Sequence, residues 1–276
     1  MPVKKDASGH RYVEAEVEVP GTPEEVWRAI ANGPGISSWF VPSEVEEREG
    51  GTAVAHFGPG NSMDSVGKIS KWEPPHRFVI MTDELGEGAP PVASEWTVEA
   101  RTSGTAVVRV VHRWFAQDDA WDNQFESHES AWPDFFRILR LYLTYFRGQA
   151  SSAFQIMGVA PEPATGAWNR LIEALGSGEP VVAGSFRTSG ASPVLSGIVE
   201  RVGEPGYHQL LLRLEQPAPG VAHLFALPMD GRVYLAMRVY LYGDRADGVV
   251  AREEPLWHTW MGERFGEVES GASAGE

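Results

Sequence analysis

The chain of 276 residues contains no cysteine, which excludes disulfide bonds, thiolate nucleophiles and thiolate metal ligands. It also contains no apolar run near the roughly 18 residues that a membrane-spanning helix needs. Its polar first ten residues lack the apolar segment of a secretory signal peptide. We therefore expect a cytoplasmic protein that has no membrane partner.

Basic residues are few, because 23 Lys and Arg stand against 38 Asp and Glu and give a formal net charge of −15. Both halves of the chain are acidic, and no Lys/Arg cluster is present. Binding to nucleic acid or to an anionic membrane would meet long-range repulsion, so we expect no nucleic-acid partner. With 42% hydrophobic residues, the chain can form one large domain or two ordinary ones.

The first half begins with a strand that is followed by a helix. Residues 11–20 alternate apolar side chains with glutamate, which is typical of a strand with one buried face. Thr22 and Glu25 have the spacing of a capping box, and Pro23 suits a first helical turn. We expect this helix to extend to about Ala31 and interpret residues 32–35 as its stop signal.

A short helix or turn, residues 36–40, leads into strand-like segments that are separated by Gly and Pro turns. The expected strands are residues 43–49, 52–57, 64–72, 77–83, 92–101 and 105–115. After them, apolar side chains recur at helical spacing at Trp132, Phe135, Phe136, Leu139, Leu143 and Phe146. The pattern predicts an α+β fold in which one long helix covers an antiparallel meander.

Six short motifs occur in an order that is shared with a known superfamily. They are Thr22-Pro-Glu-Glu-Val-Trp-Arg-Ala-Ile, Ser38-Trp-Phe-Val-Pro, Glu49-Gly-Gly, Gly67-Lys-Ile, Trp72-Glu-Pro-Pro-His-Arg-Phe and Glu129-Ser-Ala-Trp132. Over residues 10–148 the chain resembles the START-like (SRPBCC) superfamily, and most of all the branch related to the C-terminal domain of the Hsp90 ATPase activator. This resemblance implies a helix-grip fold, in which an antiparallel sheet wraps around a long C-terminal helix and leaves a deep apolar cavity.

Strand alternation predicts which side chains point into that cavity. In residues 105–115, Arg109 and Arg113 fall on the outward face, so His112 and its neighbours on the other face point inward. The expected ligand-binding residues are Trp39, Phe40, Phe78, Trp96, Val98, Val110, His112, Trp114, Trp132, Phe135 and Phe136. So many aromatic rings favour a flat, apolar ligand. The alternative is that the same rings form ordinary core and fill the cavity themselves.

Candidate catalytic groups are scarce. His112 is the one candidate for an acid–base role, because imidazole titrates near neutral pH, and a structural histidine is the alternative. The face of His56 is not assigned. Residues 118–129 concentrate carboxylates, but their spacing matches no metal motif. The chain has no phosphate-binding loop and no nucleophile elbow. We therefore expect no metal and no cofactor, and favour a non-catalytic protein.

The second half reads as a further α+β unit. Residues 149–166 are rich in Ala, Ser, Gly and Pro and are interpreted as a linker between domains 1–148 and 167–276. After it we expect a helix at 167–175, five strands, a helix at 251–265 and a polar tail. The five strands are residues 180–187, 194–202, 207–215, 221–227 and 232–242. This order repeats the first half without its opening strand, so we interpret it as a second, degenerate START-like unit.

The main hypothesis for function is binding of a small hydrophobic or aromatic molecule in the cavity of residues 10–148. The resemblance leaves two alternatives open. One is an aromatase/cyclase-like enzyme that acts on polyketide-type substrates through His112 and a partner such as Asp122 or His128. The other is an Hsp90-type chaperone-interaction module, and self-association is a further option.

Overall fold

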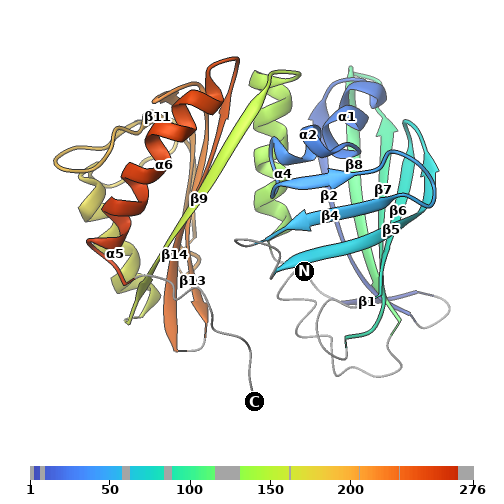
Figure 1. The fold of residues 1–276 in the computed structure, drawn as a ribbon, viewed down its shortest axis with the longest axis horizontal. Helices are drawn as coiled ribbons and strands as arrows, with labels where there is room; N and C mark the ends of the chain where they lie inside the picture. The colour runs from blue at the N-terminus through green and yellow to red at the C-terminus, as the bar shows by residue number, and fades with distance from the viewer. Residues whose placement is uncertain are drawn as a thin grey trace. The chain divides into compact units, whose positions relative to one another are not determined.

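The computed structural model describes residues 3–6, 10–57, 63–83, 89–115, 131–161, 163–204, 206–229 and 231–266. The chain divides into two compact units, Met1–Gly148 and Gln149–Glu276. Each unit combines one antiparallel sheet with a few helices, which confirms the α+β class (Figure 1). In the part of the chain that is described, no helix is long and apolar enough to cross a membrane.

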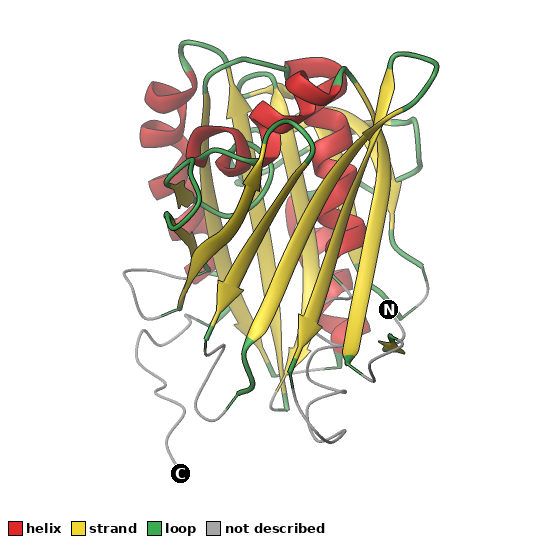
Figure 2. Ribbon diagram, turned by 90° about the vertical axis from the view of Figure 1, so that its right-hand side faces the viewer, coloured by secondary structure: helices red, strands yellow, loops and turns green. Residues whose placement is uncertain are grey.

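The first unit contains an eight-stranded sheet. Its strands are β1 (Lys4–Lys5), β2 (Arg11–Pro20), β3 (Ser43–Val45), β4 (Thr52–His56), β5 (Asp64–Glu73), β6 (Arg77–Thr82), β7 (Val92–Ala100) and β8 (Thr105–Trp114). They lie in the order β1-β2-β8-β7-β6-β5-β4-β3, and every neighbouring pair is antiparallel. The expected meander is confirmed, and Figure 2 shows its twisted strands side by side.

Two short helices connect β2 to β3. Helix α1 (Pro23–Ile30) begins with the expected capping box, in which Thr22 and Glu25 bond each other's backbone N–H groups. Helix α2 (Gly33–Ser37) corrects the interpretation of residues 32–35 as a stop signal only. Asn32 caps this new helix by accepting a bond from the Gly35 N–H, because its side chain replaces the missing backbone acceptor.

The long helix after β8 has two parts. Helix α4 (Trp132–Leu141) carries Pro133 in its first turn and continues into the π-helical turn η1 (Tyr142–Phe146). All six apolar residues that the helical spacing selected are buried: Trp132, Phe135, Phe136, Leu139, Leu143 and Phe146. The apolar stripe therefore places this helix on the inner face of the sheet, as the helix-grip fold requires.

The second unit is a six-stranded sheet with two helices. Its elements are β9 (Ser151–Ala160), α5 (Ala164–Leu175), β10 (Ser185–Arg187), β11 (Ser196–Val202), β12 (Gln209–Gln216), β13 (Gly220–Met229), β14 (Arg232–Tyr242) and α6 (Ala246–Gly262). The strand order is β10-β11-β12-β13-β14-β9. Helices α5 and α6 cover the face that carries Phe154, Leu212, Leu224 and Met237.

The linker prediction for residues 149–166 is wrong. Most of this segment is strand β9, which pairs with β14 from Ser151↔Tyr242 to Ala160↔Val233. Phe154 and Ile156 are buried on one face, so the Ser, Ala and Gly residues between them belong to a regular alternating strand.

Strand β9 supplies the opening strand that the second unit was expected to lack. In the first unit β2 pairs with the last strand, β8, and in the second unit the first strand, β9, pairs with the last strand, β14; the strands beyond each pair follow as a meander. In both units the last helix lies against the first strand, α4 on β2 and α6 on β9. The two sheets therefore have matching topology and form a tandem arrangement.

Candidate functional site

An aromatic cluster occupies the inner face of the first sheet. Cross-strand pairing places Phe78, Trp96 and Val110 in one row across β6, β7 and β8. The rings of Phe78 and Trp96 stack, with centroids 5.9 Å apart and an interplanar angle of 6°. The strand alternation that predicted these inward positions is confirmed by their burial.

Helix α4 adds rings to this row from the opposite side. Trp132 lies with its ring centroid 5.2 Å from that of Trp96 and stacks on Phe40 at the same distance. Phe40 in turn lies 4.5 Å from Phe135. We define the aromatic cluster as Trp39, Phe40, Phe78, Trp96, Trp132, Phe135 and Phe136. Seven predicted ligand-binding residues are thus brought together.

One polar pair lies beside this cluster. His112 and Ser94 face each other across β8 and β7, and Ser94 Oγ lies 2.8 Å from His112 Nδ1. The imidazole ring stacks on Trp132 with centroids 5.5 Å apart. Burial lowers the pKa of His112 to about 4, because a charged imidazolium would lose its hydration there. The ring is therefore neutral at pH 7 and can accept or donate a hydrogen bond.

Some predicted ligand-binding residues do not belong to the aromatic cluster, and some residues that lie beside the cluster were not predicted. Trp114 packs with Val13 and Val92 in a separate group of buried residues. Trp27 and Trp72 extend the cluster instead, with centroids 5.0 Å apart and both close to Phe78. The remaining predicted residues, Val98 and Val110, are buried strand residues of the same inner face. Ser94 could have been found in the sequence, because it precedes Trp96 by two and shares its face.

The described rings of the cluster pack against one another between the sheet and the helix, with centroid distances from 4.5 to 6.4 Å. Two hollows of about 410 and 400 Å³ lie elsewhere, between β2 and the helix α4–η1. Arg140 lines both hollows, so they are neighbours along the side of β2, and we call the two together the groove.

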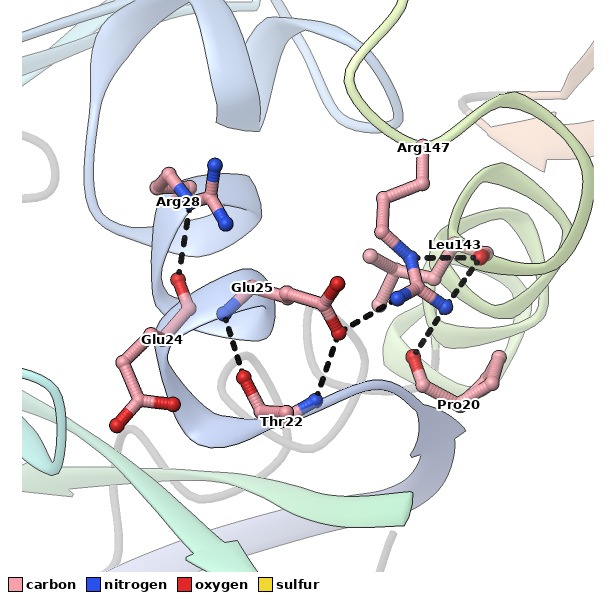
Figure 3. A network of polar contacts seen from close by, with 7 residues as sticks. All are labelled: Pro20, Thr22, Glu24, Glu25, Arg28, Leu143 and Arg147. Atoms are coloured by element: carbon pink, nitrogen blue, oxygen red, sulfur yellow. Dashed lines mark hydrogen bonds and ion pairs between the residues drawn. The ribbon is translucent and has the colours of Figure 1, made fainter. Parts of the chain in front are cut away.

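A network of hydrogen bonds connects the start of helix α1 with the end of η1 (Figure 3). The Arg147 guanidinium donates to Glu25 Oε2 at 2.6 Å and to the carbonyl oxygens of Pro20 and Leu143. The Thr22 backbone N–H and Arg147 hold the pKa of the Glu25 carboxyl below its usual value. This network connects the start of α1 with the end of η1 and is structural, since no ring of the cluster takes part.

In strand β4, His56 lies on the face opposite to that of Ala53 and Ala55. Its Nδ1 lies 2.8 Å from Asp64 Oδ1, across the pairing of β4 with β5. Among the described residues, no group of three or more His, Asp or Glu side chains has the arrangement of a metal site. The acidic segment 118–129, including Asp122 and His128, lies outside the described residues.

Comparison with known proteins agrees with this architecture. Residues 20–144 match the family described as Activator of Hsp90 ATPase homolog 1-like protein. The first unit is an AHSA1-like domain. The matched residues begin at the end of β2 and stop in η1, so they contain the aromatic cluster and the Ser94–His112 pair. No curated protein matches the chain significantly.

Solved structures resemble either the AHSA1-like domain or the whole chain. The di-domain ARO/CYC BexL from the BE-7585A biosynthetic pathway is 14% identical, with 94% of this chain and 99% of that chain covered and a TM-score of 0.46. DynU16 from the dynemicin biosynthetic locus is also 14% identical, with 91% and 95% covered and a TM-score of 0.41. The Aha1 dimer from Colwellia psychrerythraea is 18% identical, with 49% and 96% covered and a TM-score of 0.39. At these TM-scores none of them bears on function.

Proposed function

We propose that the AHSA1-like domain binds a small, flat, apolar molecule that carries one hydrogen-bonding group, between the rings of the aromatic cluster and the Ser94–His112 pair. The observation that carries this proposal is the neutral, half-buried His112, whose ring stacks on Trp132 and whose Nδ1 lies within hydrogen-bond distance of Ser94 Oγ. Ligand sites in proteins combine mostly apolar walls with a few polar groups that fix orientation.

The position of this polar pair supports binding over a purely structural role. Burying a polar group costs free energy, and an apolar residue at position 112 would continue the packing of Val108 and Val110 on β8. The imidazole and the hydroxyl lie on the inner face of the sheet, among rings that would stack on a planar ligand. Such ring stacking contributes about 0.5–1.5 kcal/mol per well-placed pair beyond the buried area.

Ligand entry requires at least one ring to move, because the rings contact one another. Phe40 and Trp132 are the expected movers, since each retains a little solvent exposure and Phe40 touches the exposed ring of Phe57. Trp39 and Phe78 are more deeply buried, and the Trp39 indole N–H is fixed by the Ala29 carbonyl at 2.8 Å. They form the fixed floor of the proposed site.

Two matched probes test this proposal: 1-hydroxyanthraquinone and anthraquinone, which differ by one hydroxyl group. Binding is followed by quenching of tryptophan fluorescence and by the shift of the melting temperature. We expect the full chain to bind the hydroxylated probe more tightly, and His112→Leu to remove that preference while anthraquinone binding stays. Trp168→Phe, in the second unit, serves as the control and leaves both affinities unchanged.

Three results would contradict the proposal. The first is that neither probe, nor a wider panel of flat aromatic compounds, shifts the melting temperature of the intact chain. The second is that the hydroxyl preference survives in His112→Leu. The third is that Phe40→Ala and Trp132→Ala, which open the outer layer of rings, leave probe affinity unchanged although the variants remain folded.

A further inference from the structure

Strand β2 has an edge that pairs with another strand over only part of its length. On that side, β1 pairs with β2 only through Lys4↔Tyr12 and Lys5↔Arg11. From Val13 to Pro20, β2 has no strand partner on this edge among the described residues.

The pairing pattern shows which backbone groups this edge presents. The Gly21 N–H bonds the Gly104 carbonyl on the side of β8, and the Asp6 N–H bonds the His10 carbonyl on the side of β1. Backbone groups of a strand alternate in direction, so even-numbered residues of β2 point away from β8. Glu14, Glu16 and Glu18 therefore offer their N–H and C=O groups at the open edge.

The far end of this edge is consistent with that alternation. The Pro20 carbonyl, the next even-numbered position, accepts a bond from Arg147 Nη2 at 3.3 Å. A side chain thus satisfies the carbonyl of Pro20. The outward backbone groups of Glu14, Glu16 and Glu18 pair with no strand in the part of the chain that the structure describes.

The groove between β2 and the helix α4–η1 runs along this edge. Its two parts are lined on the sheet side by residues 14–20 and Thr105. The helix side is lined by Pro133, Phe136, Arg137, Arg140 and Thr144, so its two arginines exclude basic side chains from the groove itself. A strand rises about 3.3 Å per residue, so these seven strand residues match an extended peptide of about seven residues. The hollows of about 400 and 410 Å³ provide room for its side chains.

Charge defines the chemistry of the peptide that would fit. The side chains of Glu14, Glu16 and Glu18 share one face. Arg109 on β8 pairs with Glu14 and Glu16, but the side chain of Glu16 is still 65% exposed. Residues directly opposite each other on paired strands are close, and opposite charges there are favourable. The chain's own β1 makes a related diagonal contact: Lys4 is paired with Tyr12, and its Nζ lies 2.6 Å from Glu14 Oε1.

We propose that the open edge of β2 binds an extended segment of a partner protein by strand addition. The segment lies antiparallel to β2, as β1 does, with Lys or Arg at alternate positions opposite Glu16 and Glu18. Its other side chains are small or apolar and lie in the groove near Phe136 and Thr144. Main-chain bonds to the even-numbered residues of β2 supply affinity, and the alternating basic side chains supply specificity.

The test uses a labelled probe, acetyl-Thr-Lys-Val-Lys-Val-Lys-Thr-amide, and the full chain, with binding measured by fluorescence anisotropy. In antiparallel pairing, the lysines opposite the glutamates direct their own N–H groups at β2. N-methylation of the three lysine nitrogens should weaken binding about tenfold or more. N-methylation of the valine nitrogens, which point away, should leave binding nearly unchanged. A scrambled peptide of the same composition should bind weakly.

Variants of Glu16 separate charge from backbone pairing. Glu16→Thr removes the charge and keeps the N–H, so binding should fall about two- to fivefold. Glu16→Pro also removes the outward N–H but breaks no bond to β8, because proline is tolerated where an edge N–H faces solvent. It should weaken binding at least tenfold while the melting temperature stays close to that of Glu16→Thr.

Hydrogen exchange supplies an independent readout. Peptide binding should slow exchange in residues 11–20 and leave β3, the strand at the other edge of the sheet, unaffected. Equal affinity for the two N-methylated peptides, equal affinity for the scrambled peptide, or unchanged exchange in β2 would each overturn the proposal and indicate simple adhesion of cations to an acidic protein. The preference for the hydroxylated anthraquinone depends on His112, which does not line the groove, so failure of the peptide test leaves the proposed ligand site unaffected.

Discussion

The guanidinium of Arg147 lies 2.6 Å from the carboxylate of Glu25, although 122 positions separate the two residues. The same guanidinium bonds the Pro20 and Leu143 carbonyls, so it joins the end of β2, the start of α1 and the last helical turn (Figure 3). We expect Arg147→Met to destabilise the chain by about 1 kcal/mol, because several partly exposed bonds are lost together. Urea unfolding measures this. Arg140→Met, the same change without such a network, should have a smaller effect.

The pKa of Glu25 gives this network a pH dependence. The folded-state pKa is lowered, so the stabilisation is present above the unfolded value near 4.5 and is lost as the pH falls through the folded value. Melting temperatures measured from pH 6 to pH 3 should fall more steeply for the unmodified chain than for Glu25→Gln. Parallel curves would show that the carboxylate adds no pH-dependent stability.

His112 should control stability in a different pH range. Its folded-state pKa of about 4 lies below the ordinary value of 6.5, so the unfolded chain binds this proton first as the pH falls. Relative to His112→Leu, the chain should lose about 3 kcal/mol of unfolding free energy between pH 6.5 and pH 4. Denaturant unfolding at several pH values tests this. Titration of the His112 ring signal near pH 6.5 in NMR spectra would refute it.

Trp96 is expected to be the most sensitive position of the aromatic cluster. It touches Phe78, Trp39, Trp132 and Phe136, so removal of its ring leaves a hole that four neighbours line. Trp96→Ala should lower the unfolding free energy by about 3–5 kcal/mol. Trp72→Ala, at the more exposed end of the ring series, should cost less in the same urea titration.

Strand β9 should decide whether the second unit folds when it is produced separately. A fragment of residues 149–276 keeps β9 paired with β14 and packed on α6. A fragment of residues 167–276 lacks β9, so the edge of β14 and the face of α6 that contacts β9 become exposed. We expect cooperative thermal unfolding, followed by circular dichroism, for the longer fragment only. Equal cooperativity would show that β9 is dispensable for the second core.

Local signals in the sequence identified most elements with small errors. The alternation of residues 11–20 and the capping box at Thr22 predicted β2 and α1 because neighbouring residues settle both features. The last helix begins at Ala246, five residues before the expected start. The early start was not predicted because Arg245, the residue before it, makes no side-chain capping bond. The expected strand at 180–187 shortens to Ser185–Arg187, where pairing with β11 begins.

The composition of β9 is typical of a linker, although the segment is a strand. Its Ser, Ala and Gly residues have weak strand preference, and only the long-range partner β14 makes them a strand. The same limit applies to the candidate site. Alternation showed that Trp96 and His112 face inward, but the distances between rings depend on how α4 packs on the sheet.

The sequence by itself determined the acidic charge, the α+β class, the inward face of each strand and the apolar stripe of the long helix, since these follow from neighbours along the chain. The tertiary structure decided that rings of the sheet and the helix contact one another and that Arg147 reaches Glu25. It also decided that β2 has, among the described residues, an open edge beside a groove. These features arise between residues far apart in the chain, where side-chain shape and strand pairing act together and no local pattern records the outcome.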